Sequence, residues 1–175
     1  FYYSATRMLI GAFALVLISS LTEKAQNANR KRKGLPAISP DQQITERKII
    51  LKGGSACGVI IFFAANTQQI GLVSTGAGKT AFITTLYIVI VPLLALFLKQ
   101  IPNLYNWIGV AFATVGLYFL CITESLTIAR GDLIILIGAL FWALHILFMG
   151  HYAPQVNVAK LVCVQFFVAG FMSLV

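Results

Sequence analysis

The sequence between Gln69 and Leu98 constrains the fold more than any other stretch of the chain. One apolar segment ends there, a short turn of small and polar residues runs from Ser74 to Lys79, and a second apolar segment follows at once. A connection this short makes the two segments antiparallel and adjacent. Because both segments are long enough to cross a bilayer, this stretch predicts a membrane helix hairpin.

The composition extends this interpretation to the whole chain. Hydrophobic residues make up 59% of the 175 positions and charged residues 10%, compared with roughly 45–50% and about 25% in soluble domains. A spanning helix needs about 20 mostly apolar residues. We therefore predict an all-α polytopic membrane protein with six transmembrane helices. The predicted spans are Tyr3–Leu21, Ile49–Val73, Thr80–Leu98, Leu104–Thr123, Asp132–Gly150 and Asn157–Val175.

Residues 22–48 form the only long polar segment, which its charge and prolines predict to be a flexible loop. Eight of the thirteen basic residues lie between Lys24 and Lys52, including the run Arg30–Lys33. Beside membrane spans, such a cluster indicates the cytoplasmic side rather than nucleic-acid binding. It also suits contact with anionic lipid head groups. With this loop inside, ten basic residues lie in cytoplasmic connections, and only Lys79 and Arg130 lie outside.

Amide and hydroxyl side chains in two neighbouring spans are candidates for lining a solute cavity. A polar group facing hydrocarbon is costly unless it is hydrogen-bonded, so these groups are expected to face protein or water. Asn66 and Gln69 share one helix face, whereas Gln68 is predicted to point elsewhere. Thr84 and Tyr87 continue a polar stripe on the next span and are predicted to face these amides.

The turn between these spans resembles a phosphate-binding loop only superficially. That motif requires a glycine five residues before Gly78, where this chain has Val73. We predict instead an outer turn with Lys79 at the membrane interface and Thr80 as a helix N-cap. Further along, Pro92 lacks an N–H group and is predicted to kink its helix.

Three further residues have two interpretations each. Trp142 and His145 share a helix face, and they either pack in the protein or line the cavity. Imidazole titrates between about pH 5 and 8, so His145 is also a candidate for proton coupling, because no Asp or Glu lies in the middle of a span. Exchange without a coupling ion stays open. Arg7 either extends to the nearby interface or contacts an anionic group.

The alternative to a transporter is a membrane-embedded enzyme or a lipid-processing protein. That class needs clustered metal ligands, paired carboxylates or a nucleophile beside a base. The sequence offers none of these spacings, and Cys57, Cys121 and Cys163 read as small buried hydrophobes. We therefore expect no enzyme activity, no metal and no cofactor.

The chain resembles the EamA-type transporters of the drug/metabolite transporter superfamily. The resemblance is most specific in the turn and kinked span, and it extends over almost the whole chain except the basic loop. The matching segments are Gly71–Thr84, Leu86–Tyr87, Val91–Leu94, Asn106–Val110, Gly116–Tyr118, Gly131–Leu133, Ala139–Ala143 and Ala5–Ile10.

The resemblance implies ten helices in two inverted five-helix repeats. This chain then corresponds to helices two to seven and is truncated at both ends. Residues 1–129 are the first repeat without its first helix, and residues 130–175 begin the second repeat. The implied function is export of a small organic solute or metabolite by alternating access, across the bacterial inner membrane, with the loop 22–48 in the cytoplasm. The expected partners are the small-molecule solute and the lipid bilayer, no nucleic acid is expected, and the oligomeric state stays open.

Overall fold

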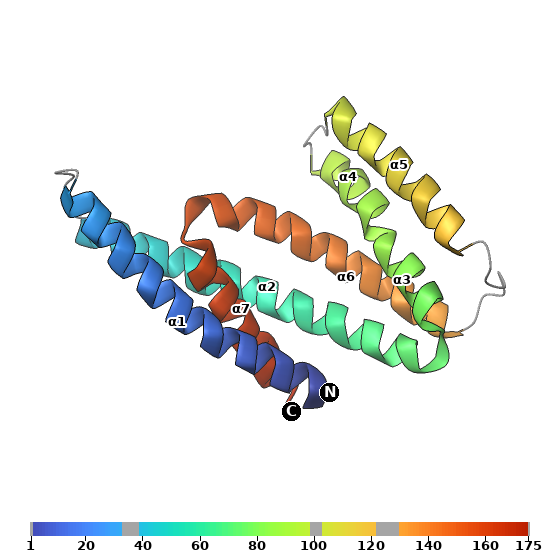
Figure 1. The fold of residues 1–175 in the computed structure, drawn as a ribbon, viewed down its shortest axis with the longest axis horizontal. Coiled ribbons are helices and arrows are strands. Elements are labelled where there is room, and N and C mark those ends of the chain that lie inside the picture. Colours follow the sequence, from blue (N-terminus) through green and yellow to red (C-terminus); the bar gives the residue numbers. More distant parts are fainter. Residues whose placement is uncertain (1, 33–38, 99–102, 122–129, 175) are drawn as a thin grey trace. The chain divides into compact units, whose positions relative to one another are not determined.

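The computed structural model is built from helices in every part that it describes, namely residues 2–32, 39–98, 103–121 and 130–174 (Figure 1). The elements are α1 (Tyr2–Arg32), α2 (Pro40–Ser74), α3 (Ala77–Thr85), α4 (Tyr87–Phe97), α5 (Leu104–Cys121), α6 (Arg130–Tyr152), the 3₁₀ helix η1 (Ala153–Gln155) and α7 (Val158–Met172). This confirms the prediction of an all-α chain.

Four helical segments of the described chain are long and apolar enough to cross a membrane: Tyr2–Thr22, Pro40–Ser74, Ala77–Phe97 and Arg130–Gln155. Leu104–Gly116 and Val158–Met172 are shorter apolar helices at the positions of the other two predicted spans. Large apolar side chains such as Phe13, Phe97 and Phe112 are exposed, which suits contact with lipid. The prediction of a polytopic membrane protein is confirmed.

The prediction of a flexible loop over residues 22–48 is wrong. α1 continues to Arg32 and α2 already begins at Pro40, so only residues 33–38 lie outside the described part. Residues 22–32 contain no Gly or Pro, and Ala, Lys and Arg make up six of the eleven, which favours continuation of a helix. The side chains of Arg30 and Lys31 are not described, and Lys33 lies outside the described residues.

A capping box fixes the start of α2. The Gln42 backbone N–H donates to Ser39 Oγ at 3.2 Å, and the Ser39 backbone N–H donates to Gln42 Oε1 at 3.3 Å. Pro40 occupies the first helical position, where its missing N–H costs nothing. These three residues explain why the helix begins well before the apolar span.

The chain divides into two compact units, each described here by itself. Unit 1 contains residues 1–62 and 148–175, and in it α1 packs against α7 (Figure 1). Gly11 faces the ring of Phe166, and Gly170 faces Leu9. Two glycines allow α2 to pack closely on α7, since Gly54 and Gly58 lie against α7 side chains and backbone carbonyls.

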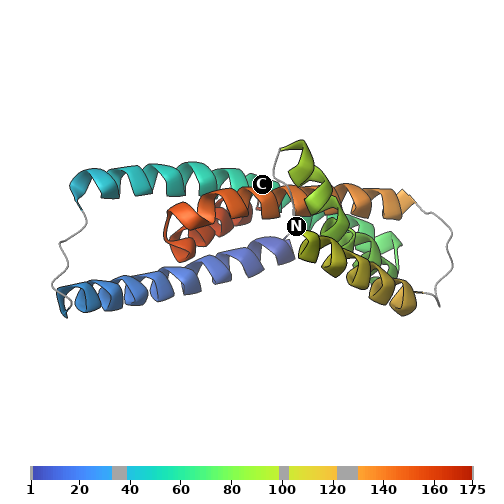
Figure 2. The same cartoon turned by 90° about the horizontal axis from the view of Figure 1, so that it is seen from above.

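Unit 2 contains residues 63–147, where α4 and α5 lie side by side in both views (Figures 1 and 2). The end of α2 approaches the start of α6 closely. A Cβ on Gly138 would lie 2.7 Å from Thr67 Oγ1, and one on Gly71 would lie 3.0 Å from the Gly131 carbonyl oxygen. Glycines on both helices, which have no side chain, therefore permit this close contact.

The predicted span 80–98 is interrupted at Leu86, which separates α3 from α4. Next to the interruption, Thr85 Oγ1 donates to the Ala81 carbonyl at 2.6 Å, a back-bond that often accompanies bends in helices. The Leu86 N–H donates to the Ile83 carbonyl at 3.2 Å, a tighter pattern than that of an α-helix. Pro92, the residue predicted to kink this span, lies inside α4.

The prediction of Thr80 as a helix N-cap is wrong. α3 begins at Ala77 after Gly76, which provides no side-chain cap. Thr80 lies inside the first turns of the helix, and its hydroxyl donates to the Thr75 carbonyl at 3.5 Å. The extended backbone of Gly76 allows the helix to start earlier than the Thr signal indicates.

Candidate functional site

The predicted cavity residues and the kink residue all lie in unit 2, namely Asn66, Gln69, Thr84, Tyr87, Pro92, Trp142 and His145. In this unit a polar contact joins α2 to α3. Gln68 Nε2 donates to Thr84 Oγ1 at 3.1 Å, and Thr84 is buried. Thr84, one residue of the predicted polar stripe, therefore contacts an amide of the preceding helix. The amide that it contacts is Gln68, which the sequence analysis had placed on another face, whereas Gln69 is half-buried without being its partner.

Asn66 is buried, with 5% of its surface exposed, and Tyr87 is half-buried at the start of α4. Asn66 is therefore enclosed by protein, an environment that suits an amide in a membrane helix. Asn66 and Tyr87 thus stay candidates for a cavity lining, but no described contact joins them.

α6 contributes an aromatic group to unit 2. The rings of Trp142 and His145 meet edge to face with centroids 6.0 Å apart, and Phe141 stacks on Phe63 of α2 at 5.4 Å. The Trp142 indole Nε1 is buried and has no hydrogen-bond partner among the described residues. A buried N–H donor of this kind calls for an acceptor such as water or a bound molecule.

An ionic cluster of the buried Thr75 and Asp132 with the half-buried Lys79 was not predicted from the sequence. Thr75 Oγ1 donates to Asp132 Oδ1 at 3.1 Å, and Lys79 Nζ forms a salt bridge with Asp132 Oδ2. Lys79 was expected at the membrane interface, and Asp132 was named only as the first residue of its predicted span. The available signal was the opposite charge of Lys79 and Asp132, together with the outer position predicted for Lys79 and for Arg130, which lies two residues before Asp132.

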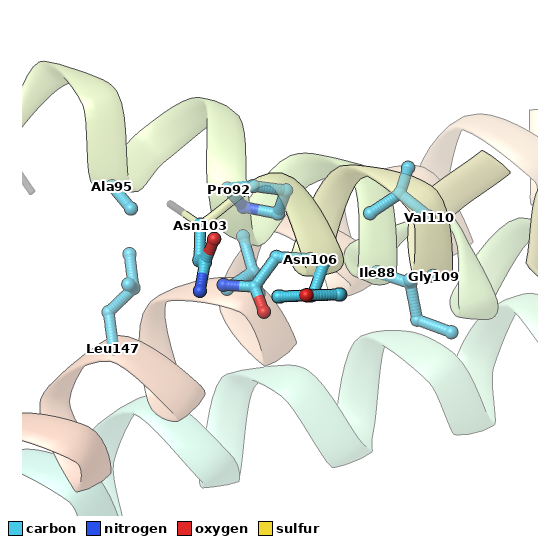
Figure 3. Close-up of a pocket in the computed structure, with 10 residues that line it drawn as sticks. Ile88, Pro92, Ala95, Asn103, Asn106, Gly109, Val110 and Leu147 are labelled. Carbon is cyan, nitrogen blue, oxygen red and sulfur yellow. The ribbon is translucent and has the colours of Figure 1, made fainter. Parts of the chain in front are cut away.

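A pocket of about 760 Å³ lies between α4, α5 and α6 within unit 2. Figure 3 shows the carboxamides of Asn103 and Asn106 beside Pro92. The rest of the lining is mainly apolar, and it contains no charged side chain. Of the residues chosen from the sequence, only Pro92 lines this pocket. Asn103 and Asn106 were missed because they lie at the start of a span, where polar residues are common.

Arg7 lies in unit 1, on an exposed face of α1. Its guanidinium carbon is 5.6 Å from the centre of the Tyr3 ring, which is a cation–π contact. This position fits a side chain that extends to the interface. Among the described residues, no three His, Cys, Asp or Glu side chains gather in a way that could hold a metal ion.

Comparison with known proteins finds a matching family and a relative. The model of the EamA-like transporter family matches residues 1–122. A relative from Archaeoglobus fulgidus, whose name is "Uncharacterized transporter", is 32% identical over 123 residues. The alignment covers 70% of this chain and 39% of the relative, so the chain spans well under half the length of that protein. No solved structure matches the chain significantly.

Proposed function

Because the chain belongs to the EamA-like transporter family, we propose that it is part of a secondary transporter that exports a small organic solute by alternating access. Residues 1–129 are then the first repeat without its first helix, and residues 130–175 are the start of the second. The membrane is the plasma membrane, with residues 22–48 on the cytoplasmic side. Family membership favours transport over the alternative of a membrane-embedded enzyme.

We place the solute contacts on unit 2, at Asn66, Gln69, Thr84, Tyr87, Trp142 and His145. The observation that carries this proposal is the Trp142 indole N–H, which is buried and has no hydrogen-bond partner among the described residues. Because this N–H group is buried in an apolar helix, it favours a solute with an accessible oxygen or nitrogen atom that can accept a hydrogen bond. The amide, hydroxyl and phenol groups in this set are neutral at the pH of most cells.

The chemistry of these groups favours an uncharged or weakly charged solute with an apolar body. Carboxamides, hydroxyls and aromatic rings supply hydrogen bonds and stacking without a fixed charge. The pocket beside Pro92 has the same character, since two carboxamides face an otherwise mostly apolar wall.

The test is solute efflux from liposomes that contain the complete protein. Trp142→Phe keeps an aromatic ring but removes the N–H, and we expect roughly a fivefold rise in KM, the effect of losing one hydrogen bond of about 1 kcal/mol. Trp107→Phe is the matched control, because Trp107 is exposed on α5. Asn66→Ala and Tyr87→Ala are expected to slow transport. Unchanged KM in Trp142→Phe and unchanged rates in the other two variants would remove these assignments.

A further inference from the structure

The first turn of α3 is tied to the first turn of α6 inside unit 2. Lys79 of α3 and Asp132 of α6 form the salt bridge, and the Thr75 hydroxyl donates to the second carboxylate oxygen. The side chain of Asp132 is 7% exposed and that of Lys79 is 21% exposed. The carboxylate thus lies in the interior, while its cation keeps some access to the surface.

The backbone around Asp132 is shaped for this contact. A Cβ on Gly131 would collide with Ser74 Oγ and would lie 2.6 Å from Thr75 Oγ1. A side chain at position 131 would therefore push the Thr75 hydroxyl away from the carboxylate. The absence of a side chain there brings the turn after α2 onto the start of α6.

The other end of α3 is the interruption at Leu86. α3 has only nine residues, and the regular α-helical pattern stops where Leu86 bonds to the Ile83 carbonyl. Interruptions of this kind are places where helices bend. α3 is therefore a short segment with an interruption at one end and a salt bridge at the other.

The energetics of a buried salt bridge suit a contact that is either fully made or fully broken. Such a pair adds little stability compared with apolar side chains of the same volume, but removing one partner is strongly unfavourable. A contact of this type therefore stabilises one arrangement of the helix ends specifically. It does so without a large gain in the stability of the fold.

We propose that α3 acts as a gate in the transport cycle, pivoting at Leu86, and that the Lys79–Asp132 salt bridge holds the gate in the conformation described here. This inference rests on the proposed transport function. In the other conformation the start of α3 moves away from the start of α6, and Lys79 leaves the Asp132 carboxylate. Lys79 and Asp132 are thus positioning residues that control access and do not bind the solute.

Distances between spin labels test the gate without any solute. Labels on Ala77→Cys and Leu133→Cys, at two exposed positions of α3 and α6, are introduced into the complete protein without its native cysteines. Asp132→Asn keeps an oxygen that accepts from Thr75 but removes the charge. We expect this change to raise the ratio of molecules with a long label distance to molecules with a short one on the order of 100-fold, which is the effect of breaking a buried ion pair.

Three further variants complete the distance measurement. Lys79→Gln is expected to lengthen the distances like Asp132→Asn. The exchanged pair Lys79→Asp with Asp132→Lys is expected to restore short distances, and Lys52→Gln, which removes an exposed lysine of α2, is expected to change nothing. Unchanged distances in both Asp132→Asn and Lys79→Gln would overturn the gate.

Transport by the same protein separates the two proposals. A short bis-methanethiosulfonate bridge between Lys79→Cys and Asp132→Cys is expected to stop efflux, and reduction is expected to restore it, with each single cysteine variant as a control. Full efflux by the bridged protein would refute the gate. Distances that respond to Asp132→Asn in a protein that transports no solute would refute the proposed function and leave the movement of α3 established.

Discussion

Gly58 shows how one missing side chain determines helix packing in unit 1. A Cβ there would lie 2.7 Å from Val168 Cβ and 2.8 Å from the Gln165 carbonyl oxygen. Because a backbone oxygen cannot rotate away, we expect Gly58→Ala to destabilise the protein by about 1–3 kcal/mol, the usual cost of overpacking. Thermal unfolding of the detergent-solubilised protein measures this as a lowered Tm.

Gly109→Ala is the control for that prediction. No described atom lies within 4 Å of the place where its Cβ would be, and Ala favours a helix over Gly by about 1 kcal/mol. Its Tm is expected to be equal to or above that of the wild type. If both variants lowered Tm equally, close packing at Gly58 would not be the cause.

His145 provides a prediction on proton coupling. If the solute is exchanged for protons through this part of the protein, we expect His145→Gln to abolish the dependence of transport on pH between about 5 and 8, where imidazole titrates. His151→Gln, at the exposed end of the same helix, is expected to behave like the wild type. Efflux at a series of pH values decides the point, and an unaltered profile in His145→Gln excludes this residue as the carrier.

At the residue scale, the burial of polar side chains was easier to predict from the sequence than their hydrogen-bond and ion-pair partners. Asn66 and Thr84 are buried in the structure, because the cost of a polar group in hydrocarbon depends only on its own chemistry. The contacts of Gln68 with Thr84 and of Lys79 with Asp132 depend on how two helices are rotated against each other. Periodicity within one helix contains no information about that rotation.

At the scale of elements, the start of α2 depends on a few polar residues. Ser39→Ala removes the side-chain half of the capping box, and we expect the first turn of the helix to lose about 1 kcal/mol of stability. Hydrogen exchange at the backbone amides of the first turn is the measurement, and it should become faster. Ser39→Asp keeps an acceptor and is expected to exchange like the wild type, so equal exchange in all three proteins would argue against the cap.

The positions of the helices were predicted from the lengths of the apolar segments. This criterion does not detect helices that continue beyond the membrane into water. Residues 22–32 and 40–48 are helical although they are polar. Ser39, Pro40 and Gln42 contained the signal for the second of these extensions, but the charge and the two prolines of this segment led to the prediction of a loop. The break at Leu86 was missed because Thr85 has no distinctive pattern in sequence.

At the scale of the whole molecule, the orientation in the membrane remains a prediction from the distribution of Lys and Arg. In a protein without native cysteines, we expect an impermeant maleimide to label Ala77→Cys in intact cells. Asp41→Cys is expected to react only after the cells are permeabilised. Both positions are exposed, so a difference in labelling reports sidedness, and the opposite pattern would reverse the orientation.

α1 is one unbroken helix of 31 residues, about 46 Å long at 1.5 Å per residue, whereas the hydrocarbon layer is about 30 Å thick. From Ala12 to Arg32 it contains no Gly or Pro that would give it a flexible joint. When a straight helix that extends beyond the bilayer changes its tilt, its free end moves farther than the membrane-spanning part. A fluorophore at position 32, which is exposed, would therefore report changes in the tilt of the membrane-spanning part of α1.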